Sequence, residues 1–205
     1  MRNLQEKFWA GEFGDHYSDR NNELRLVIPN IALFTKILRR MGRVQSICEL
    51  GANVGLNLIA LHTLLPDAEL TAVEINQKAV KELENLKYVK VKCGSIYEVP
   101  LKKMQYDLVF SKGVLIHQDP TMLNDMYQIL YQSSKRYILI CEYYNPTPIE
   151  VEYRGNKSVL FKRDFAGELM EQYSDLELLD YGFIYHRDCH FPGDDFTWFL
   201  LEKKK

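Results

Sequence analysis

The sequence predicts an α/β protein built on a doubly wound, mostly parallel sheet. Short apolar runs alternate with amphipathic segments between residues 43 and 142, which is the pattern of strands that alternate with helices. A glycine-containing turn follows the first apolar run and opens the next helix. Two β-rich segments end the chain with only a turn-rich stretch between them, so we expect an antiparallel pair of strands at one edge of the sheet.

The elements are predicted from apolar spacing and from the breakers between them. The first forty residues are predicted to be helical, with Pro29 starting or kinking a segment and Gly42 closing it. Strands are predicted in the apolar runs 44–50, 69–74, 88–92, 106–110 and 136–142, the last being a central strand covered on both faces. Helices are predicted at 54–65, 77–86, 120–133 and 163–173. An irregular stretch is expected at 145–158, and the terminal strands are expected at 176–186 and 196–203.

Composition and charge limit the class of protein. The chain has 205 residues, of which 46% are hydrophobic and 26% are charged, as in one ordinary globular domain. The formal net charge of -2 provides no overall attraction to nucleic acid or to an anionic membrane. The first ten residues lack the apolar core of a signal peptide, and no apolar run approaches the roughly 20 residues that span a bilayer. We therefore expect a cytoplasmic protein that binds neither nucleic acid nor membrane.

Cysteine and histidine spacing argues against a metal site. The four cysteines lie far apart along the chain, and no pair has metal-ligand spacing. Two histidines, a cysteine and an aspartate lie close together at 186–194, but their spacing fits no standard site. We expect no metal, and we expect a reducing compartment.

The strongest local signal is a turn with the sequence Glu49-Leu50-Gly51-Ala52-Asn53-Val54-Gly55. It follows a predicted strand and opens a predicted helix, which is where ligand-binding turns occur in doubly wound sheets. Gly51 allows a tight turn and the close approach of a ligand, and Gly55 allows the helix and strand to pack. Asn53 stands where glycine is common, but asparagine tolerates left-handed backbone angles.

Two carboxylates flank this turn and indicate the ligand. Glu74 ends the second predicted strand, nineteen residues beyond Gly55, where a carboxylate can accept both hydroxyl protons of a ribose. A nicotinamide dinucleotide would use the same residue, so Glu74 alone does not discriminate. Glu49, just before the first glycine, would repel a pyrophosphate but could bind the cationic amino-acid end of S-adenosylmethionine. An α/β protein whose glycines merely form a tight loop is the remaining alternative.

Further candidates follow the third and fourth predicted strands. Ser95 either hydrogen-bonds the adenine, with Ile96 packed on the base, or belongs to an ordinary loop after a strand. His117 is either a general base near neutral pH or a packed structural residue. Lys112 either binds a substrate anion or points to water.

The aromatic, glycine-rich segment 8–21 predicts a lid over the ligand. Tyr17 and Arg20 could reach the donor's carboxylate from this segment. The alternative is a hydrophobic staple for the N-terminal helices.

The acceptor side is expected after the fifth strand, where Tyr143 and Tyr144 lie. Farther along the chain, cations are mixed with aromatic residues, which suits an acidic, polar substrate such as a carboxylated or nucleotide-linked sugar. The alternative is that each of these charges is solvated on the surface.

The same residues resemble a known family. The run from Glu49 to Asn57, together with Glu74 and the segment 107–117, resembles class I S-adenosylmethionine-dependent methyltransferases. Four longer strings resemble the pseudaminic acid biosynthesis-associated methylases: Phe8-Trp9-Ala10-Gly11-Glu12-Phe13-Gly14, Glu142-Tyr143-Tyr144-Asn145-Pro146, Leu160-Phe161-Lys162-Arg163-Asp164-Phe165 and Asp180-Tyr181-Gly182-Phe183. The chain departs from the wider superfamily at Asn53, where glycine is frequent, and at Ser95, where an aspartate often contacts adenine.

The resemblance implies a seven-stranded, Rossmann-like methyltransferase fold and S-adenosylmethionine as the methyl donor. We expect an N-terminal helical cap (1–42), a donor-binding half (43–142) and an acceptor-side half that ends in the hairpin (143–205). The residues expected to bind the donor are Phe8, Trp9, Tyr17, Arg20, Glu49, Gly51, Asn53, Gly55, Glu74, Ile75, Ser95, Ile96 and Ser111. The residues expected to bind the acceptor are Lys112, Tyr143, Tyr144, Arg154, Lys157 and Arg163.

The predicted reaction is in-line transfer of a methyl group to an amine or hydroxyl of a sugar of bacterial surface glycans. An amine acceptor needs only to be neutral, whereas a hydroxyl needs a base, for which His117 is the candidate. Three alternatives stay open: an NAD-dependent oxidoreductase on the same glycine turn, a non-catalytic S-adenosylmethionine-binding module, and methylation of RNA or protein. The sequence carries no signal for the oligomeric state.

Overall fold

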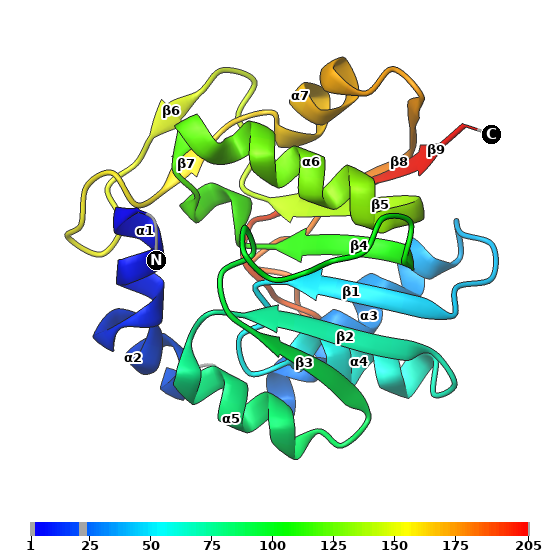
Figure 1. Ribbon diagram of the computed structural model, residues 1–205, viewed down its shortest axis with the longest axis horizontal. Helices are drawn as coiled ribbons and strands as arrows, with labels where there is room; N and C mark the ends of the chain where they lie inside the picture. Colours follow the sequence, from blue (N-terminus) through cyan, green and yellow to red (C-terminus); the bar gives the residue numbers. More distant parts are fainter. Residues whose placement is uncertain (1–2, 21–23, 205) are drawn as a thin grey trace.

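The computed structural model describes residues 3–20 and 24–204. Asn21, at the end of the predicted lid segment, lies outside the described residues, as do Met1, Arg2 and Lys205. The described chain forms a seven-stranded sheet in the order β3-β2-β1-β4-β5-β9-β8, and β6 and β7 form a separate two-stranded sheet (Figure 1).

The large sheet is parallel except at its C-terminal edge. The strands that pair in parallel are β1 (Ser46–Leu50), β2 (Glu69–Glu74), β3 (Val89–Cys93), β4 (Tyr106–Lys112) and β5 (Ser134–Glu142). In contrast, β9 (Thr197–Lys203) runs antiparallel to β5 and to β8 (Leu176–Phe183). The predicted doubly wound sheet with an antiparallel C-terminal pair is therefore confirmed.

Helices cover both faces of this sheet and one of its ends. On one face lie α3 (Val27–Leu38) and α4 (Leu56–Leu64), and α6 (Leu123–Ser133) crosses the other (Figure 1). Two more helices flank the sheet, α5 (Gln77–Asn85) beside β3 and α7 (Phe165–Gln172) beside β5. The N-terminal helices α1 (Leu4–Ala10) and α2 (Glu12–Arg20) lie at the edge where the parallel strands end (Figure 1). Short 3₁₀ helices are η1 (Leu24–Leu26), η2 (Leu115–His117) and η3 (Pro120–Met122).

No helix among the described residues combines the length and the apolarity that crossing a bilayer requires.

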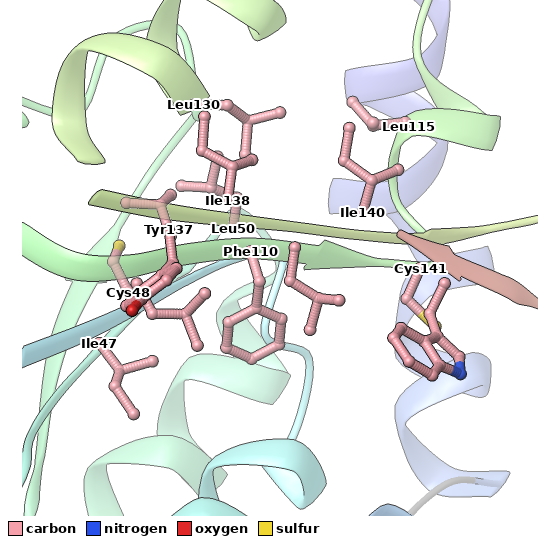
Figure 2. Packing of buried hydrophobic residues seen from close by; sticks show 14 of the residues in the cluster. Ile47, Cys48, Leu50, Phe110, Leu115, Leu130, Tyr137, Ile138, Ile140 and Cys141 are labelled. Atoms are coloured by element: carbon pink, nitrogen blue, oxygen red, sulfur yellow. The ribbon is translucent and has the colours of Figure 1, made fainter. Parts of the chain in front are cut away.

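The centre of the sheet is buried on both faces. Ile138 and Ile140 of β5 point toward the face that Leu130 of α6 covers, whereas Phe110 of β4 points to the opposite face (Figure 2). There the ring of Phe34 from α3 meets Phe110 edge to face, with the ring centroids 5.5 Å apart. All five side chains are almost completely buried. Burial of this much apolar surface fixes β4 and β5, and with them the loops that leave their carboxyl ends.

Some helix boundaries differ from the predicted ones. The helix α4 starts at Leu56 rather than at residue 54, because Gly55 has a left-handed φ of 85° and cannot continue a right-handed helix. Likewise, α3 ends at Leu38, before Gly42. The predicted helix 120–133 begins as the 3₁₀ turn η3 and becomes α6 only at Leu123.

The stretch predicted to be irregular contains a strand. Here β6 (Ile149–Glu150) pairs with β7 (Phe161–Lys162), and the Val151 amide extends the pairing by donating to the Leu160 carbonyl at 2.9 Å. A two-residue strand carries too few positions to show an alternating pattern, so the sequence gives no periodic signal for it. The hairpin matters because its tip carries Tyr153 to the site described below.

Candidate active site

The glycine turn between β1 and α4 uses three left-handed residues. The backbone φ is 74° at Gly51, 45° at Asn53 and 85° at Gly55. A Cβ at Gly51 would lie 2.6 Å from Cγ2 of Val114, so glycine is required there by packing as well as by φ. Asn53 adopts the left-handed conformation, as its side chain permits, and its Oδ1 accepts a hydrogen bond from Ser18 Oγ of α2 at 2.8 Å.

Gly55 has a different contact from the predicted one. A Cβ there would come within 2.7 Å of Leu83 Cδ2, on α5. The residue therefore permits close packing between α4 and α5 rather than between a helix and a strand, and it is not among the residues that line the cavity.

A cavity of about 460 Å³ is lined by residues at the carboxyl ends of the parallel strands and by residues of α1 and α2. Figure 1 shows these two helices beside that end of the sheet. One part is lined by the turn after β1 and by the acidic residues Glu49 and Glu74. Another part is lined by aromatic rings. We use the name aromatic wall for Tyr17, Trp9, His117 and Tyr153, which lie next to one another in this order. The centroids of adjacent rings are 4.6 to 5.2 Å apart.

Glu74 is held by the backbone at the end of β2. Its Oε2 accepts from the Asn53 amide at 2.7 Å, and its Oε1 accepts from the amides of Ile75 and Asn76 at 2.8 Å. The side chain is buried, which raises its pKa, and the three backbone donors oppose that shift. Because a carboxylate offers about four acceptor positions, Glu74 is oriented by the chain and still able to accept hydroxyl protons.

Glu49 has fewer partners than Glu74. Its Oε1 accepts from Asn57 Nδ2 at 2.6 Å, whereas its buried Oε2 finds no hydrogen-bond donor among the described residues. Burial raises the pKa of Glu49 to about 8, although Asn57 and the charge of Lys112 act in the opposite direction. A buried carboxylate oxygen without a donor is costly. A ligand ammonium group would satisfy it, so the residues present fit the cationic amino-acid end of S-adenosylmethionine.

His117 is packed into the aromatic wall. Its ring lies 4.6 Å from Trp9 and 5.2 Å from Tyr153, centroid to centroid, and its Nδ1 is 2.6 Å from the Val159 carbonyl oxygen. A carbonyl oxygen only accepts, so Nδ1 carries the proton and Nε2 carries the lone pair. Burial lowers the pKa of His117 to about 4, which makes its Nε2 a weak base.

The loop that carries His117 is anchored by Glu142 at the end of β5. Its Oε1 accepts from the amides of Val114 and Leu115 and from Ser111 Oγ, each at 3.0 Å. Its Oε2 accepts from the Ile116 amide at 3.4 Å. Burial raises the pKa of Glu142 to about 7 despite these donors. Ser111 thus binds Glu142, and it is not among the residues that line the cavity.

The predicted donor-binding residues separate into two groups. Those that line the cavity are Trp9, Tyr17, Glu49, Gly51, Asn53, Glu74, Ile75 and Ile96. Those placed away from it are Phe8, Arg20, Gly55, Ser95 and Ser111. Phe8 stacks on Phe13 with centroids 4.1 Å apart, and the Arg20 guanidinium lies 5.8 Å from the Tyr17 ring. Ser95 donates instead to the carboxylate of Glu6.

The predicted acceptor-binding residues separate in the same way. Lys112 and Tyr143 line the cavity, as does the predicted base His117. The residues placed away from it are Tyr144, Arg154, Lys157 and Arg163. Three of these side chains make other contacts. Tyr144 packs on Phe199, Arg154 lies over the Tyr153 ring, and Arg163 forms an ion pair with Glu168 at 2.7 Å. Lys157 is exposed.

Several residues of the site were not predicted from the sequence, and four of them hold other parts of the site or line the cavity. Asn57 orients Glu49, and Glu142 holds the loop of His117. Asn76 caps α5 and donates to Asp15 and to the Trp9 carbonyl of the N-terminal helices. His186 lines the cavity, with its Nδ1 2.8 Å from both oxygens of Asp195. Only Asn76 has a local signal, since an asparagine before a helix is a common N-cap.

Within the described residues, no group of three or more histidine, cysteine, aspartate or glutamate side chains is arranged to hold a metal ion.

Part of the chain matches a known protein family. Residues 47–135 match the methyltransferase domain family, a segment that runs from β1 through α6. None of the curated proteins matches the sequence.

Several solved structures share the fold over nearly the whole chain. A methyltransferase of Haloferax volcanii in complex with the Trm112 activator is 14% identical, with a TM-score of 0.70 over 99% of this chain and 98% of that one. The 1,6-didemethyltoxoflavin N1-methyltransferase of Burkholderia thailandensis is 13% identical, with a TM-score of 0.71 over 98% and 88%. The magnesium protoporphyrin IX methyltransferase of Synechocystis PCC 6803 is 13% identical, with a TM-score of 0.69 over 97% and 98%. The last two structures contain S-adenosylhomocysteine.

The fold is that of the class I methyltransferases, and residues 47–135 match a methyltransferase domain. The chain is a methyltransferase.

Proposed function

We propose that Glu49 and Glu74 hold the two ends of S-adenosylmethionine and that the acceptor is an amine or hydroxyl of a small polar molecule in contact with the aromatic wall. The observation that carries the donor part is Glu49 Oε2, a buried acceptor for which the described residues supply no donor. Glu49 then binds the ammonium group, and Glu74 accepts from the ribose hydroxyls. Gly51 permits close approach of the ligand between them.

When bound, S-adenosylmethionine supplies a methyl group on a positively charged sulfur, which is already activated for transfer. The residues of the chain therefore act mainly by positioning the acceptor and excluding water. Trp9, Tyr17 and Tyr153 provide rigid surfaces for this purpose, and Glu142 fixes the loop that completes the wall.

We further propose that the acceptor is a nonulosonic acid or nucleotide sugar of bacterial surface glycans. The support is the resemblance to the pseudaminic acid biosynthesis-associated methylases together with Lys112. Of the four cations expected to bind an acidic acceptor, Lys112 is the one on the cavity wall, with its Nζ 5.7 Å from the centroid of the Phe196 ring. A single cation suits one carboxylate or phosphate group.

An amine acceptor is favoured over a hydroxyl. A neutral amine needs no base, whereas a hydroxyl needs one with a pKa near the working pH. The pKa of His117, about 4, is low for this purpose. If the acceptor is a hydroxyl, His186 is the second candidate base, because it lines the cavity and Asp195 orients its ring.

Calorimetric titration with S-adenosylhomocysteine tests the donor part. We expect Glu49→Gln to weaken binding by about tenfold or more, because a hydrogen bond between charged groups is lost. The matched control is Glu84→Gln on the exposed part of α5, which should bind as the wild type does. Equal affinities for the wild type and Glu49→Gln would remove Glu49 from the donor site. Binding of NADH in place of S-adenosylhomocysteine would instead favour an oxidoreductase.

Labelled S-adenosylmethionine tests the acceptor part. The protein is incubated with nucleotide-sugar and glycan extracts, and the product that gains a methyl group is identified by mass. Label in an acidic sugar, with a higher KM for Lys112→Gln, is the expected result. Label in an RNA or protein fraction would contradict the sugar assignment. Tight binding of S-adenosylhomocysteine with no transfer to any fraction would favour a non-catalytic binding module, or a need for an activator such as the one bound to the Haloferax volcanii protein.

For a hydroxyl acceptor with His117 as its base, His117→Ala should slow transfer by about 10²-fold or more. Unchanged turnover in that variant would exclude His117 from proton transfer.

A further inference from the structure

The ribose carboxylate Glu74 fixes where the base of the donor lies. In the parallel register Glu74 pairs with Cys93 of β3, and the next amide, Gly94, donates to the Glu74 carbonyl at 2.8 Å. The loop after β3 is therefore the immediate neighbour of Glu74 on the side away from the glycine turn. A base attached to a ribose at Glu74 extends over this loop, where Ile75 and Ile96 supply apolar surface on the cavity wall.

Helix α1 supplies two polar side chains to the part of the cavity beside the loop after β3. Glu6 lines the cavity and is only 6% exposed. It is fixed beside the β3 loop because Ser95 Oγ donates to its Oε1 across 89 residues of sequence. Because a carboxylate offers about four acceptor positions, the bond from Ser95 does not prevent Glu6 from accepting from a ligand.

A second acceptor on α1 lies beside Glu6. Gln5 also lines the cavity and is 6% exposed. Its Nε2 donates to the Ser158 carbonyl at 3.0 Å, which orients the amide. Its buried Oε1 then finds no donor among the described residues. Two neighbouring side chains of one helix thus present acceptor oxygens where the base is expected.

We propose that Glu6 recognises the 6-amino group of adenine, so that the N-terminal helix α1 reads the donor's base. This inference rests on the proposed donor site. Adenine carries a hydrogen-bond donor at position 6, whereas hypoxanthine and guanine carry an acceptor there. A carboxylate accepts from the amino group and repels a 6-oxo group. Ser95 acts by positioning Glu6 rather than by touching the base itself.

The inference also requires that α1 be docked on the β3 loop when the donor is bound. Glu6 is delivered from outside the sheet, whereas Glu49 and Glu74 belong to strands β1 and β2. The base-recognising group is therefore in place only when α1 is docked on the β3 loop. Donor binding and docking of α1 then stabilise each other.

The test compares two ligands whose bases differ at position 6, which carries an amino or an oxo group, and at N1, which is protonated only in the 6-oxo base. S-Adenosylhomocysteine and its deaminated analogue S-inosylhomocysteine are titrated calorimetrically into the wild type, Glu6→Gln and the control Glu12→Gln. Glu12 lies on the neighbouring helix α2 and is exposed. Thermal unfolding of each variant confirms that it is folded.

We expect the wild type and Glu12→Gln to bind S-adenosylhomocysteine at least about tenfold more tightly than the inosine analogue. Glu6→Gln should lose most of this preference, because a glutamine amide can donate to a 6-oxo group as well as accept from an amino group.

The outcomes separate the two proposals. Equal affinity of the wild type for the two ligands, or an unchanged preference in Glu6→Gln, would overturn the role of Glu6 while leaving the donor site intact. No binding of either ligand to the wild type would overturn the donor site and this inference with it. The comparison of ligands on the wild type can still overturn the role of Glu6 even if Glu6→Gln does not fold.

Discussion

At the scale of single residues, the site is defined by three buried carboxylates at one edge of the sheet. Glu142 accepts four hydrogen bonds from the chain, and Glu74 accepts three from backbone amides. Glu49 accepts one, from Asn57. The chain therefore satisfies Glu142 by itself, leaves acceptor positions open on Glu74, and provides no donor among the described residues for Glu49 Oε2.

Glu49 should make the ligand-free protein less stable as the pH rises. Burial raises its pKa to about 8, so the folded state binds this proton more tightly than the unfolded chain does. The resulting stabilisation is complete below the ordinary carboxyl pKa and is lost as the pH rises through about 8. We expect Glu49→Gln to match the wild type at pH 5 and to exceed its free energy of unfolding at pH 9 by on the order of a few kcal/mol.

Urea denaturation at both pH values measures this difference. Glu74 and Glu142 are present in both proteins, so their own pH dependence cancels in the comparison. A stability difference that is the same at pH 5 and pH 9 would show that Glu49 does not titrate as proposed.

His117 should remain neutral throughout the neutral pH range. Burial lowers its pKa to about 4, and the Val159 carbonyl fixes its proton on Nδ1. We expect the ring nitrogen signals of His117 in ¹⁵N NMR to stay those of one neutral tautomer between pH 5.5 and pH 8. A titration midpoint near the ordinary histidine value of about 6.5 would contradict the packed, desolvated geometry.

At the scale of elements, the site depends on the hydrogen bonds that join α1 and α2 to the loops at the carboxyl ends of the strands. Asn76 carries out two tasks at the start of α5: its Oδ1 accepts from the Ala79 amide at 2.9 Å, and its Nδ2 donates to Asp15 Oδ1 at 2.8 Å. Ser18 of α2 also donates to Asn53 of the glycine turn. The N-terminal helices are thus hydrogen-bonded directly to the loops of the proposed donor site.

Two substitutions separate the N-cap of α5 from the hydrogen bond between Asn76 and Asp15. Asn76→Ala removes both, so it should lower the free energy of unfolding by about 1–2 kcal/mol. Asp15→Ala removes only the Asn76–Asp15 bond, keeps the bond from Asn76 to the Trp9 carbonyl, and should cost less than about 1 kcal/mol. Both should raise hydrogen–deuterium exchange in residues 4–20, and Asn76→Ala should raise it more. If Asp15→Ala left that exchange unchanged, the Asn76–Asp15 bond would not be what holds the helices down.

The elements also show where sequence patterns stop being informative. The parallel strands and α4, α5 and α6 are long enough to display apolar periodicity, and they were predicted within a few residues. The strands β6 and β7 are two residues each, and η2 and η3 are single turns. These short pieces are stabilised by pairing and by caps rather than by a repeating apolar face, so no period marks them.

At the scale of the whole molecule, stability is concentrated at the centre of the sheet, beneath the site. Ile138 on β5 is fully buried, whereas Leu178 on the edge strand β8 is 43% exposed. We expect Ile138→Ala to lower the free energy of unfolding by about 2–5 kcal/mol. Leu178→Ala should change it by about 0.5 kcal/mol or less. Chemical denaturation measures both, and similar losses in the two variants would contradict a core centred on β4 and β5.

The sequence by itself determined the sheet, the glycine turn and the two carboxylates that flank it. These features are local: a strand, a turn and a helix start are encoded by residues close together in the chain, and strands of a parallel sheet bring their ends to one edge. Glu49 and Glu74 could therefore be chosen without coordinates.

Only the tertiary structure decided which of the remaining candidates reach the cavity. Ser95 meets Glu6 across 89 residues, and His117 meets Val159 across 42. Arg163, which the sequence suggested for an acceptor, is instead paired with Glu168. Burial, missing hydrogen-bond partners and shifted pKa values arise when segments distant in sequence pack together, and no pattern along the chain records that packing.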